Sequence, residues 1–291
     1  MKFAHKWSVA FCARATAIAL LVFFGFADFT PRTAAQNPDT MMPEASAAKA
    51  KQLLAQMIEA MGGQAYMNAR EMQCSGRLSN FGHSGDMTAY IEFRDYWRFP
   101  DKHRIEYGKK GNIVDVFSGA EGWTMDHGGV SDEPADKIDE FQDRLLKSAE
   151  QVVRYRLKEP GMMFRYGGED LIDLRPVDWV ELTDREDHRY RIAVQRDNHM
   201  LVRFKVTTED KVDRELNDEI TSYANYHPID GVQTPLQVAR TRNDRKVFQA
   251  FYDTCTYKPN LEANFFTKAA LEQRFQEVGS RADKKKAAKA N

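Results

Sequence analysis

The chain has 291 residues, with 42 lysine and arginine residues against 43 aspartate and glutamate residues and a formal net charge of −1. Removal of residues 1–35 would take away four basic residues and one acidic residue, which leaves a net charge of −4. A mildly acidic surface of mixed sign argues against a nucleic-acid partner, because such a partner needs a basic patch. The remaining length is enough for one large domain with its own hydrophobic core.

Residues 1–35 have the pattern of a secretory signal peptide. Positive residues precede an uncharged run over residues 15–27, which is too short to span a bilayer, and small residues follow at 33–35. Cys12 lies before the apolar run and lacks the small residue that precedes a lipidated cysteine, so no covalent lipid is expected. We therefore expect a periplasmic protein that is exported through a cleavable signal peptide.

The mature chain is predicted to begin with a leader and a helix. Residues 36–46 hold two prolines and few apolar side chains, so we expect a flexible leader. A helix is predicted over residues 47–61, because Leu53, Met57 and Ile58 recur with helical spacing, and the glycine pair after it ends the helix. This helix should pack on a sheet or close one end of it.

The following segments alternate apolar and polar residues with the period of two that is typical of β-strands, as in Ala89, Ile91 and Phe93. Further strands are predicted at residues 112–118, 123–126, 177–183, 188–195, 200–208, 219–226, 232–241 and 247–257. Short turns join them without alternating helices, which indicates a meandering antiparallel sheet of about nine to eleven strands. A sheet of that width tends to curl. The predicted fold class is mainly β, with helices added to the sheet.

The end of the chain is predicted to leave the sheet. A short helix over about residues 267–278 should close the domain, which then extends from residue 47 to residue 278. Residues 279–291 are rich in lysine and alanine, so we expect a disordered basic tail.

One amphipathic helix is predicted in the middle of the strands, over residues 136–157. Its apolar stripe consists of Ile138, Phe141, Leu145, Leu146, Ala149, Val152, Val153 and Leu157. Charged residues such as Glu150 and Arg154 take the other side, and Pro160 stops the helix. A lone helix inside a large sheet must lay its stripe on a face of that sheet, where it either plugs a concave face or covers a flat one. We expect it to rest on the concave face, opposite Trp123.

Cysteine and motif content restrict the chemistry. The exported chain would keep two cysteines, Cys74 and Cys255, and an even number of cysteines in an oxidising compartment allows a disulfide. Either a disulfide joins them, on strands near the two ends of the sheet that barrel closure brings together, or both are buried free thiols. The histidines lack metal-ligand spacing, and no nucleophile elbow, phosphate loop or CxxC motif occurs. We therefore expect no metal site, no cofactor and no enzymatic activity.

Several stretches together resemble a known family. They are RFPDKHRIEY at residues 98–107, VDVFSGAEGWTMD at 114–126, HRYRIAVQRDNHMLVRFKV at 188–206, and DGVQTP at 230–235. With the N-terminal and mid-chain helices, they are similar to the LolA/LolB-like family of periplasmic outer-membrane lipoprotein carriers and lipoprotein-sorting proteins. The resemblance extends over about residues 50–275. It implies an incomplete antiparallel β-barrel in which the mid-chain helix is a lid over an apolar cavity that accepts acyl chains.

If the chain is such a carrier, apolar residues of the early strands and the lid should face the ligand. The candidates are Trp97, Phe99, Phe117, Trp123, Met125, Phe141, Leu145, Leu146, Met162, Met163 and Phe164. Flexible methionines suit variable acyl chains, but ordinary barrel core is the alternative for each residue. In the carriers an early-strand arginine latches the lid, and Arg77 is the candidate by its position.

Three functions follow from the sequence. The first is a carrier or binding protein, expected to be a monomer, with lipoprotein or lipid acyl chains as partners; an apolar cavity would favour it. The second is an envelope sensor or protein-interaction domain that contacts envelope membrane proteins; a filled interior with an exposed hydrophobic patch would favour it. The third is a hydrolase with an unfamiliar active site; a cleft with convergent polar groups of perturbed pKa would favour it.

Overall fold

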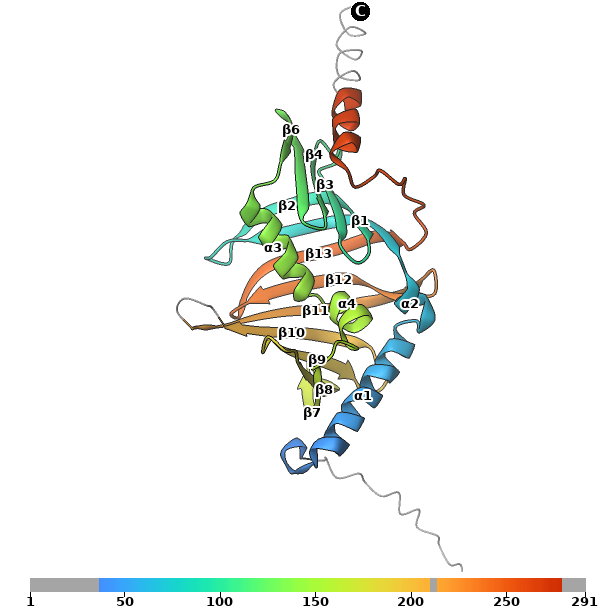
Figure 1. Ribbon diagram of the computed structural model, residues 1–291, viewed down its shortest axis with the longest axis vertical. Coiled ribbons are helices and arrows are strands. Elements are labelled where there is room, and N and C mark those ends of the chain that lie inside the picture. Colours follow the sequence, from blue (N-terminus) through green and yellow to red (C-terminus); the bar gives the residue numbers. More distant parts are fainter. Residues whose placement is uncertain (1–36, 210–213, 279–291) are drawn as a thin grey trace, which may run out of the picture. The chain divides into compact units, whose positions relative to one another are not determined.

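The computed structural model describes residues 37–209 and 214–278 (Figure 1). The predicted signal peptide and basic tail lie outside these residues. None of the helices in the described ranges is long and apolar enough to cross a membrane.

Within these ranges, thirteen strands form one antiparallel sheet. They are β1 (Glu71–Phe81), β2 (Met87–Arg98), β3 (Lys102–Tyr107), β4 (Ile113–Ser118), β5 (Glu121–Asp126), β6 (Gly129–Asp132), β7 (Met163–Ile172), β8 (Arg175–Thr183), β9 (Arg189–Gln195), β10 (Leu201–Glu209), β11 (Leu216–Ile229), β12 (Val232–Arg242) and β13 (Arg245–Thr256). The prediction of a mainly β, incomplete antiparallel barrel is confirmed, since the sheet does not close. It has more strands than the predicted nine to eleven, because none of the predicted ranges corresponds to β1, β3, β6 or β7.

The order of the strands explains why the sheet stays open. β1 and β13 are neighbours in its middle, so β6 is one free edge and β7 is the other. The chain between these two edges, residues 133–162, is the helical insert. It has to cross from one edge of the sheet to the other, and it does so over one face (Figure 1).

A disulfide joins β1 to β13. Cys74 and Cys255 are direct partners in the strand register, with their Cα atoms 4.1 Å apart. The expectation that they lie near the two ends of the sheet is wrong, because the first and last strands pair in its centre. The bridge spans 181 residues of sequence, so it restricts the unfolded chain strongly, by about 5 kcal/mol on a chain-entropy estimate.

The N-terminal helix is longer than predicted. Helix α1 runs over Pro43–Ala60, with proline in its first turn, and the one-turn 3-10 helix η1 (Pro38–Thr40) precedes it. The expectation of a flexible leader is wrong for its described part. Asp39 forms an ion pair with Arg165 of β7 at 2.6 Å, and the Ser46 hydroxyl accepts the backbone N–H of Tyr166 at 2.9 Å. These contacts fix the leader to β7.

The main core lies between α1 and the strands β7–β11. We call the face of the sheet that carries α1 and the helical insert the inner face (Figure 1). Side chains of α1 and of the insert share one hydrophobic cluster with these strands. Its fully buried members include Met57, Val152, Val153, Tyr166, Ile192 and Phe204.

The predicted central helix is broken into pieces. The insert contains α3 (Ala135–Leu146), α4 (Ala149–Gln151) and the single π-helical turn η2 (Val152–Arg156). Ser148 separates them in an extended conformation, and its side chain caps α4 by accepting the backbone N–H of Gln151 at 3.2 Å. Because of this break, side chains after residue 148 face a different direction from the one they would face in the continuous helix that was predicted.

The opposite face, which we call the outer face, has its own cover over β2–β5. Residues 268–278 are helical, in agreement with the predicted closing helix. Phe266 and Leu271 pack there against Val114 and Met125. Arg274 reaches the buried carboxylate of Glu106 at 3.0 Å. Side chains on this face are therefore separated from the helical insert by the sheet.

Candidate functional site

A cavity of about 250 Å³ lies between the inner face and the helical insert. Strands β1–β3 and β11–β13 form its floor, and α3 and α4 cover it. Its apolar and aromatic lining includes Met61, Met72, Phe93, Trp97, Phe99, Ile105, Val238 and Phe248. Sites that bury drug-sized ligands typically have volumes of roughly 300–1,000 Å³, so this smaller, partly enclosed cavity suits one slender apolar group.

Helix α3 is held over the cavity by one large side chain. Phe141 is its fully buried residue, and its ring stacks on Phe117 with the centroids 4.6 Å apart. The rings of His103 and Trp97 lie farther away, at 6.2 and 6.4 Å. The side chain of Gln142 adds a hydrogen bond to the carbonyl of Gly119. The expected contact of the stripe with the sheet is thus concentrated on Phe141.

The part of the insert after residue 148 is held more firmly. Ala149, Val152 and Val153 are fully buried in the main core. The side chain of Gln151 donates to the carbonyl of Pro100, which ties the insert to the turn before β3. A packed apolar side of this kind is costly to undock.

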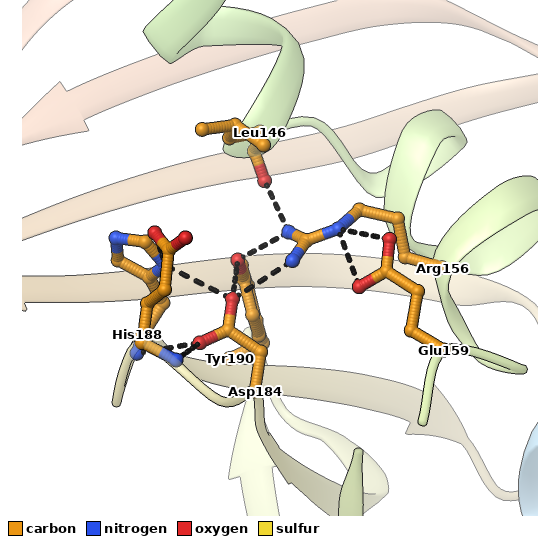
Figure 2. Close-up of polar contacts among 7 residues, drawn as sticks. Leu146, Arg156, Glu159, Asp184, His188 and Tyr190 are labelled. Atoms are coloured by element: carbon orange, nitrogen blue, oxygen red, sulfur yellow. Dashed lines mark hydrogen bonds and ion pairs between the residues drawn. The ribbon is translucent and has the colours of Figure 1, made fainter. Parts of the chain in front are cut away.

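A network of polar contacts fixes the end of the insert (Figure 2). The guanidinium of Arg156 donates to Asp184 Oδ2 at 2.9 Å, to the Tyr190 hydroxyl at 2.6 Å and to Glu159 at 3.0 Å. Its Nη1 also reaches the carbonyl of Leu146 at 3.5 Å. One side chain therefore connects η2, the end of α3 and the β8–β9 hairpin.

Asp184 is the acceptor at the centre of this network. It is 5% exposed, and it accepts the backbone N–H groups of Glu186 and His188 at 2.9 and 3.0 Å. His188 Nδ1 and the Tyr190 hydroxyl lie 2.9 and 3.0 Å from Oδ2. Burial works against the charged form of Asp184, but the hydrogen bonds from Arg156 and His188 outweigh it and lower its pKa to about 2. The carboxylate is therefore a strong anchor for η2.

These attachments divide the insert into a firm part and a loosely held part. Helix α3 relies on one aromatic anchor, whereas α4 and η2 have a packed side and the Arg156–Asp184 ion pair. The chain between them at Lys147 and Ser148 is not helical. Movement of α3 would therefore turn about residues 147–148.

One hydrogen-bonded group of polar side chains crosses the floor of the cavity. Asp95 Oδ1 lies 2.7 Å from His103 Nε2, and Asp95 Oδ2 accepts the Tyr252 hydroxyl at 3.2 Å. The imidazole of His103 stacks on Trp97 with the ring centroids 4.1 Å apart. The carboxylate of Asp95 thus connects β2, β3 and β13. In the described ranges, no three His, Cys, Asp or Glu residues are placed to hold a metal ion.

Charged side chains also line the cavity, and no pattern in the sequence predicted this. Arg144, Glu150, Arg154 and Arg240 all belong to its lining. Burial raises the pKa of the Glu150 carboxyl, and the nearby Arg154 only partly offsets this. The sequence placed Glu150 and Arg154 on the solvent side of a continuous helix. The break at residue 148 turns both side chains toward the cavity instead.

The predicted site residues fall into three groups. Trp97 and Phe99 line the cavity. Phe117 and Phe141 form the stack beside it, and Leu145 is half-buried outside its lining. The structure places the remaining predicted residues away from the cavity, so these predictions are wrong. Trp123 and Met125 lie on the outer face, Leu146 and Met163 are 40% and 60% exposed, and Met162 and Phe164 pack against the main core.

The reason for each of these corrections is the position of the side chain in its strand. Val116, the neighbour of Phe117 in β4, pairs with Trp123, so Trp123 faces the outer side while Phe117 faces α3. The predicted contact of the helix with Trp123 is therefore replaced by the contact with Phe117. Met163 lies on the edge strand β7, where its side chain points to solvent.

The prediction that Arg77 latches the lid is wrong. Arg77 is an exposed residue of β1, and its side chain is 3.8 Å from Asp253. Its neighbours Gly76 and Leu78 are buried, so alternation along the strand directs Arg77 to the outer face. The insert is instead held by its own residues, chiefly Phe141, Gln151 and Arg156.

Fold and site together define a class of protein: an open antiparallel half-barrel with a helical insert over an apolar cavity. No protein-family model matches the sequence, and no curated protein matches it. Solved structures match the fold. A DUF1329 family protein from Desulfovibrio piger superposes with a TM-score of 0.55 at 16% identity, covering 78% of this chain and 99% of its own.

One further structure connects this fold to a lipoprotein-sorting protein, and a second superposes less well. A domain from Vibrio parahaemolyticus, assigned as an outer membrane lipoprotein-sorting protein, has a TM-score of 0.51 at 11% identity and covers 79% of this chain and 100% of its own. A LolA superfamily protein from Nitrosomonas europaea has a TM-score of 0.49 at 14% identity, with coverage of 76% and 99%. The resemblance that the sequence suggested is thus confirmed at the level of the fold.

Proposed function

We propose that this protein is a periplasmic binding or carrier protein for lipoproteins or other acylated ligands. The observation that carries the proposal is the partly enclosed cavity of about 250 Å³ with its aromatic and aliphatic lining. The fold shared with lipoprotein-sorting proteins supports it. The signal-peptide pattern of residues 1–35 supports the periplasmic location. No catalytic step is part of this proposal.

The binding energy would come from removing an acyl chain from water. Each buried methylene contributes about 0.8 kcal/mol, so a chain of moderate length binds without any covalent bond. The present volume holds only a slender chain. A ligand with several chains requires more space, and movement of α3 about residues 147–148 would provide it. The proposal therefore includes α3 as the part of the lid that opens.

Native mass spectrometry of the protein purified from its own envelope tests for a co-purified acylated ligand. Titration of the delipidated protein with a fluorescent fatty acid then measures binding. Replacing Val238 in the cavity wall by tryptophan should fill the space and weaken binding at least about 10-fold. The exposed Leu171 is the matched control, since Leu171→Trp adds the same ring away from the cavity. Equal binding by both variants, or none by the unaltered protein, would refute the proposal.

A further inference from the structure

Arg144 of α3 faces the cavity without a partner for its charge. The described ranges offer no hydrogen bond or ion pair to its side chain, and its Nε is buried and unsatisfied. Its guanidinium carbon lies 5.5 Å from the ring centroid of Phe141. A buried guanidinium is normally paired with a carboxylate or another anion. Arg144 therefore has hydrogen-bond donors available to a ligand.

Arg240 of β12 supplies a second, incompletely satisfied cation on the opposite wall. Its Nε is also buried without a hydrogen bond, and Glu219 Oε1 is 3.4 Å away. That carboxylate is shared, since Arg242 reaches its other oxygen at 3.1 Å. Arg144 and Arg240 are close enough for their charges to oppose each other. Burial and then the charge of Arg240 lower the pKa of Arg144.

Resting on the carrier function proposed above, we propose that the ligand is an anionic amphiphile. Its carboxylate or phosphate headgroup would accept hydrogen bonds from both Arg144 and Arg240, and its acyl chain would lie along the apolar wall. Guanidinium groups match carboxylate and phosphate oxygens in geometry as well as in charge. The headgroup would accept hydrogen bonds from the guanidinium N–H groups that are now unsatisfied.

The acidic residues of the cavity do not reverse this preference. Asp95 is already occupied by His103 and Tyr252. Glu150 contributes at most one negative charge, whereas Arg144, Arg154 and Arg240 contribute three positive charges to the lining. Arg154 adds another guanidinium, which donates to the carbonyl of Ala69 and has no ion pair within the described part of the chain. The charge that remains for a ligand to neutralise is positive.

The placement of the two arginines couples the headgroup to the lid. Arg144 moves with α3, whereas Arg240 is fixed in the sheet. In the empty protein their like charges oppose closure of α3. An anion between them replaces this repulsion with two attractions, so a bound headgroup would hold α3 against the sheet. Ligand binding would then reduce the exchange of backbone amides in α3.

Calorimetric titration of the delipidated, exported protein at pH 8 separates headgroup from chain. The ligands are decanoate, decyl phosphate, decanol and decyltrimethylammonium, which share one chain length, together with acetate and inorganic phosphate. Both decyl anions should bind at least about 10-fold more tightly than decanol, because hydrogen bonds to a charged headgroup are stronger than those to a neutral hydroxyl. The cationic amphiphile should bind more weakly than decanol, and the two small anions should bind only weakly.

Variants assign the preference to the two arginines. Arg144→Met and Arg240→Met should each abolish most of the preference for decanoate over decanol by weakening decanoate binding, and Arg144→Lys should keep part of that preference. Lys137→Gln is the control, since Lys137 lies on α3 but pairs with Glu140 at the surface. The empty Arg144→Met protein should melt no lower than the unaltered protein, because it loses an unpaired buried charge.

The outcomes distinguish this inference from the carrier function. Equal affinity for decanoate and decanol, with no effect of Arg144→Met, would overturn the headgroup site and leave the carrier function standing. Binding of none of the amphiphiles would overturn the carrier function itself. If inorganic phosphate bound as tightly as decyl phosphate, the arginines would form a site for free anions, and the amphiphile proposal would be wrong. A lower melting temperature of Arg144→Met would give Arg144 a structural role instead.

Discussion

The inner face of the sheet is covered in two different ways. Over β7–β11, helix α1 and the turn η2 bury a continuous apolar cluster that includes Met57, Tyr166 and Phe204. Over β1–β3, β12 and β13, the cover is α3, and a cavity remains beneath it. We call these the packed half and the hollow half. Both halves have aromatic side chains on the sheet, so the difference comes from the helices.

Helix sequence decides which half becomes solid. Helix α1 buries Ala50, Leu53, Leu54 and Met57 along one side, and each reaches the sheet. Helix α3 is shorter, carries charge on half of its positions and buries Phe141 alone. A helix with one buried anchor cannot fill the space that four would fill. The hollow half is thus the consequence of a weakly apolar lid over a strongly apolar floor.

The largest expected effect comes from Phe204, which lies in the packed half and is as fully buried as Phe141 in the hollow half. Phe204→Ala removes a ring from the packed half and should lower the free energy of unfolding by roughly 3–5 kcal/mol, because the surrounding core cannot collapse around the space. Urea denaturation followed by far-UV circular dichroism measures the loss. A loss below about 1 kcal/mol would mean that the packed half is not the main source of stability.

The next effect concerns the ion pair that anchors η2. Asp184→Asn leaves the Arg156 charge with Glu159 as its one remaining ion-pair partner in the described ranges, and loss of the buried carboxylate should cost up to about 3–5 kcal/mol. The effect should shrink in acid. The pKa of Asp184 is about 2 in the folded protein against 3.8 ordinarily, so its contribution is complete above about pH 4 and is lost as the pH falls toward 2. Urea denaturation at pH 7 and at pH 2.5 measures both.

The free energy of unfolding of Asp184→Asn is compared with that of the unaltered protein at both pH values. If the difference were the same at pH 7 and at pH 2.5, the Asp184 carboxylate would not be the anchor. The surface pair of Lys268 and Asp132 provides the control, because exposed ion pairs contribute little. Lys268→Gln should therefore leave the denaturation midpoint nearly unchanged at pH 7.

Sequence patterns recovered the features that depend on local periodicity. The alternating strands, the two terminal helices and the amphipathic stripe around Phe141 follow directly from residue spacing. The antiparallel character of the sheet followed from the absence of alternating helices, whereas its open form was implied by the resemblance to the lipoprotein carriers. The edge strand β7 was missed because Gly167 and Gly168 interrupt its alternation, and the register shifts at that point.

The remaining errors come from features that no local pattern encodes. A one-residue shift between Leu201 and Arg203 places Leu201, and not Val202, opposite Val194. The face of Trp123 depends on which side the closing helix covers, and that is a long-range contact. Arg144 and Arg240 are almost a hundred residues apart, so their meeting in the cavity has no signal in a single sequence.

The third prediction uses the counterpart of Phe204 in the hollow half. Phe141→Ala removes an equally buried ring, yet the loss in the free energy of unfolding should be only about 1–2 kcal/mol. Once α3 has detached, no further contacts are lost, so the cost is limited to the docking energy of that helix. Hydrogen exchange should accelerate in residues 135–146 and stay unchanged in 149–156. A loss as large as that of Phe204→Ala would make α3 part of the core and remove the basis for a moving lid.

The smallest expected effect has the opposite sign, and it compares two carboxyl groups. Asp184 in the packed half has a lowered pKa, whereas burial raises the pKa of Glu150 in the hollow half. A raised pKa means that ionisation of Glu150 destabilises the folded protein as the pH rises, so Glu150→Gln should be more stable than the unaltered protein at pH 8. The gain should be below about 1 kcal/mol, since neighbouring guanidinium groups offset part of the burial cost. It should disappear at pH 4, where Glu150 is protonated in both folded and unfolded chains to similar extents. Thermal melts at both pH values provide the measurement, and lower stability of the variant at pH 8 would show that Glu150 forms a stabilising ion pair in the cavity.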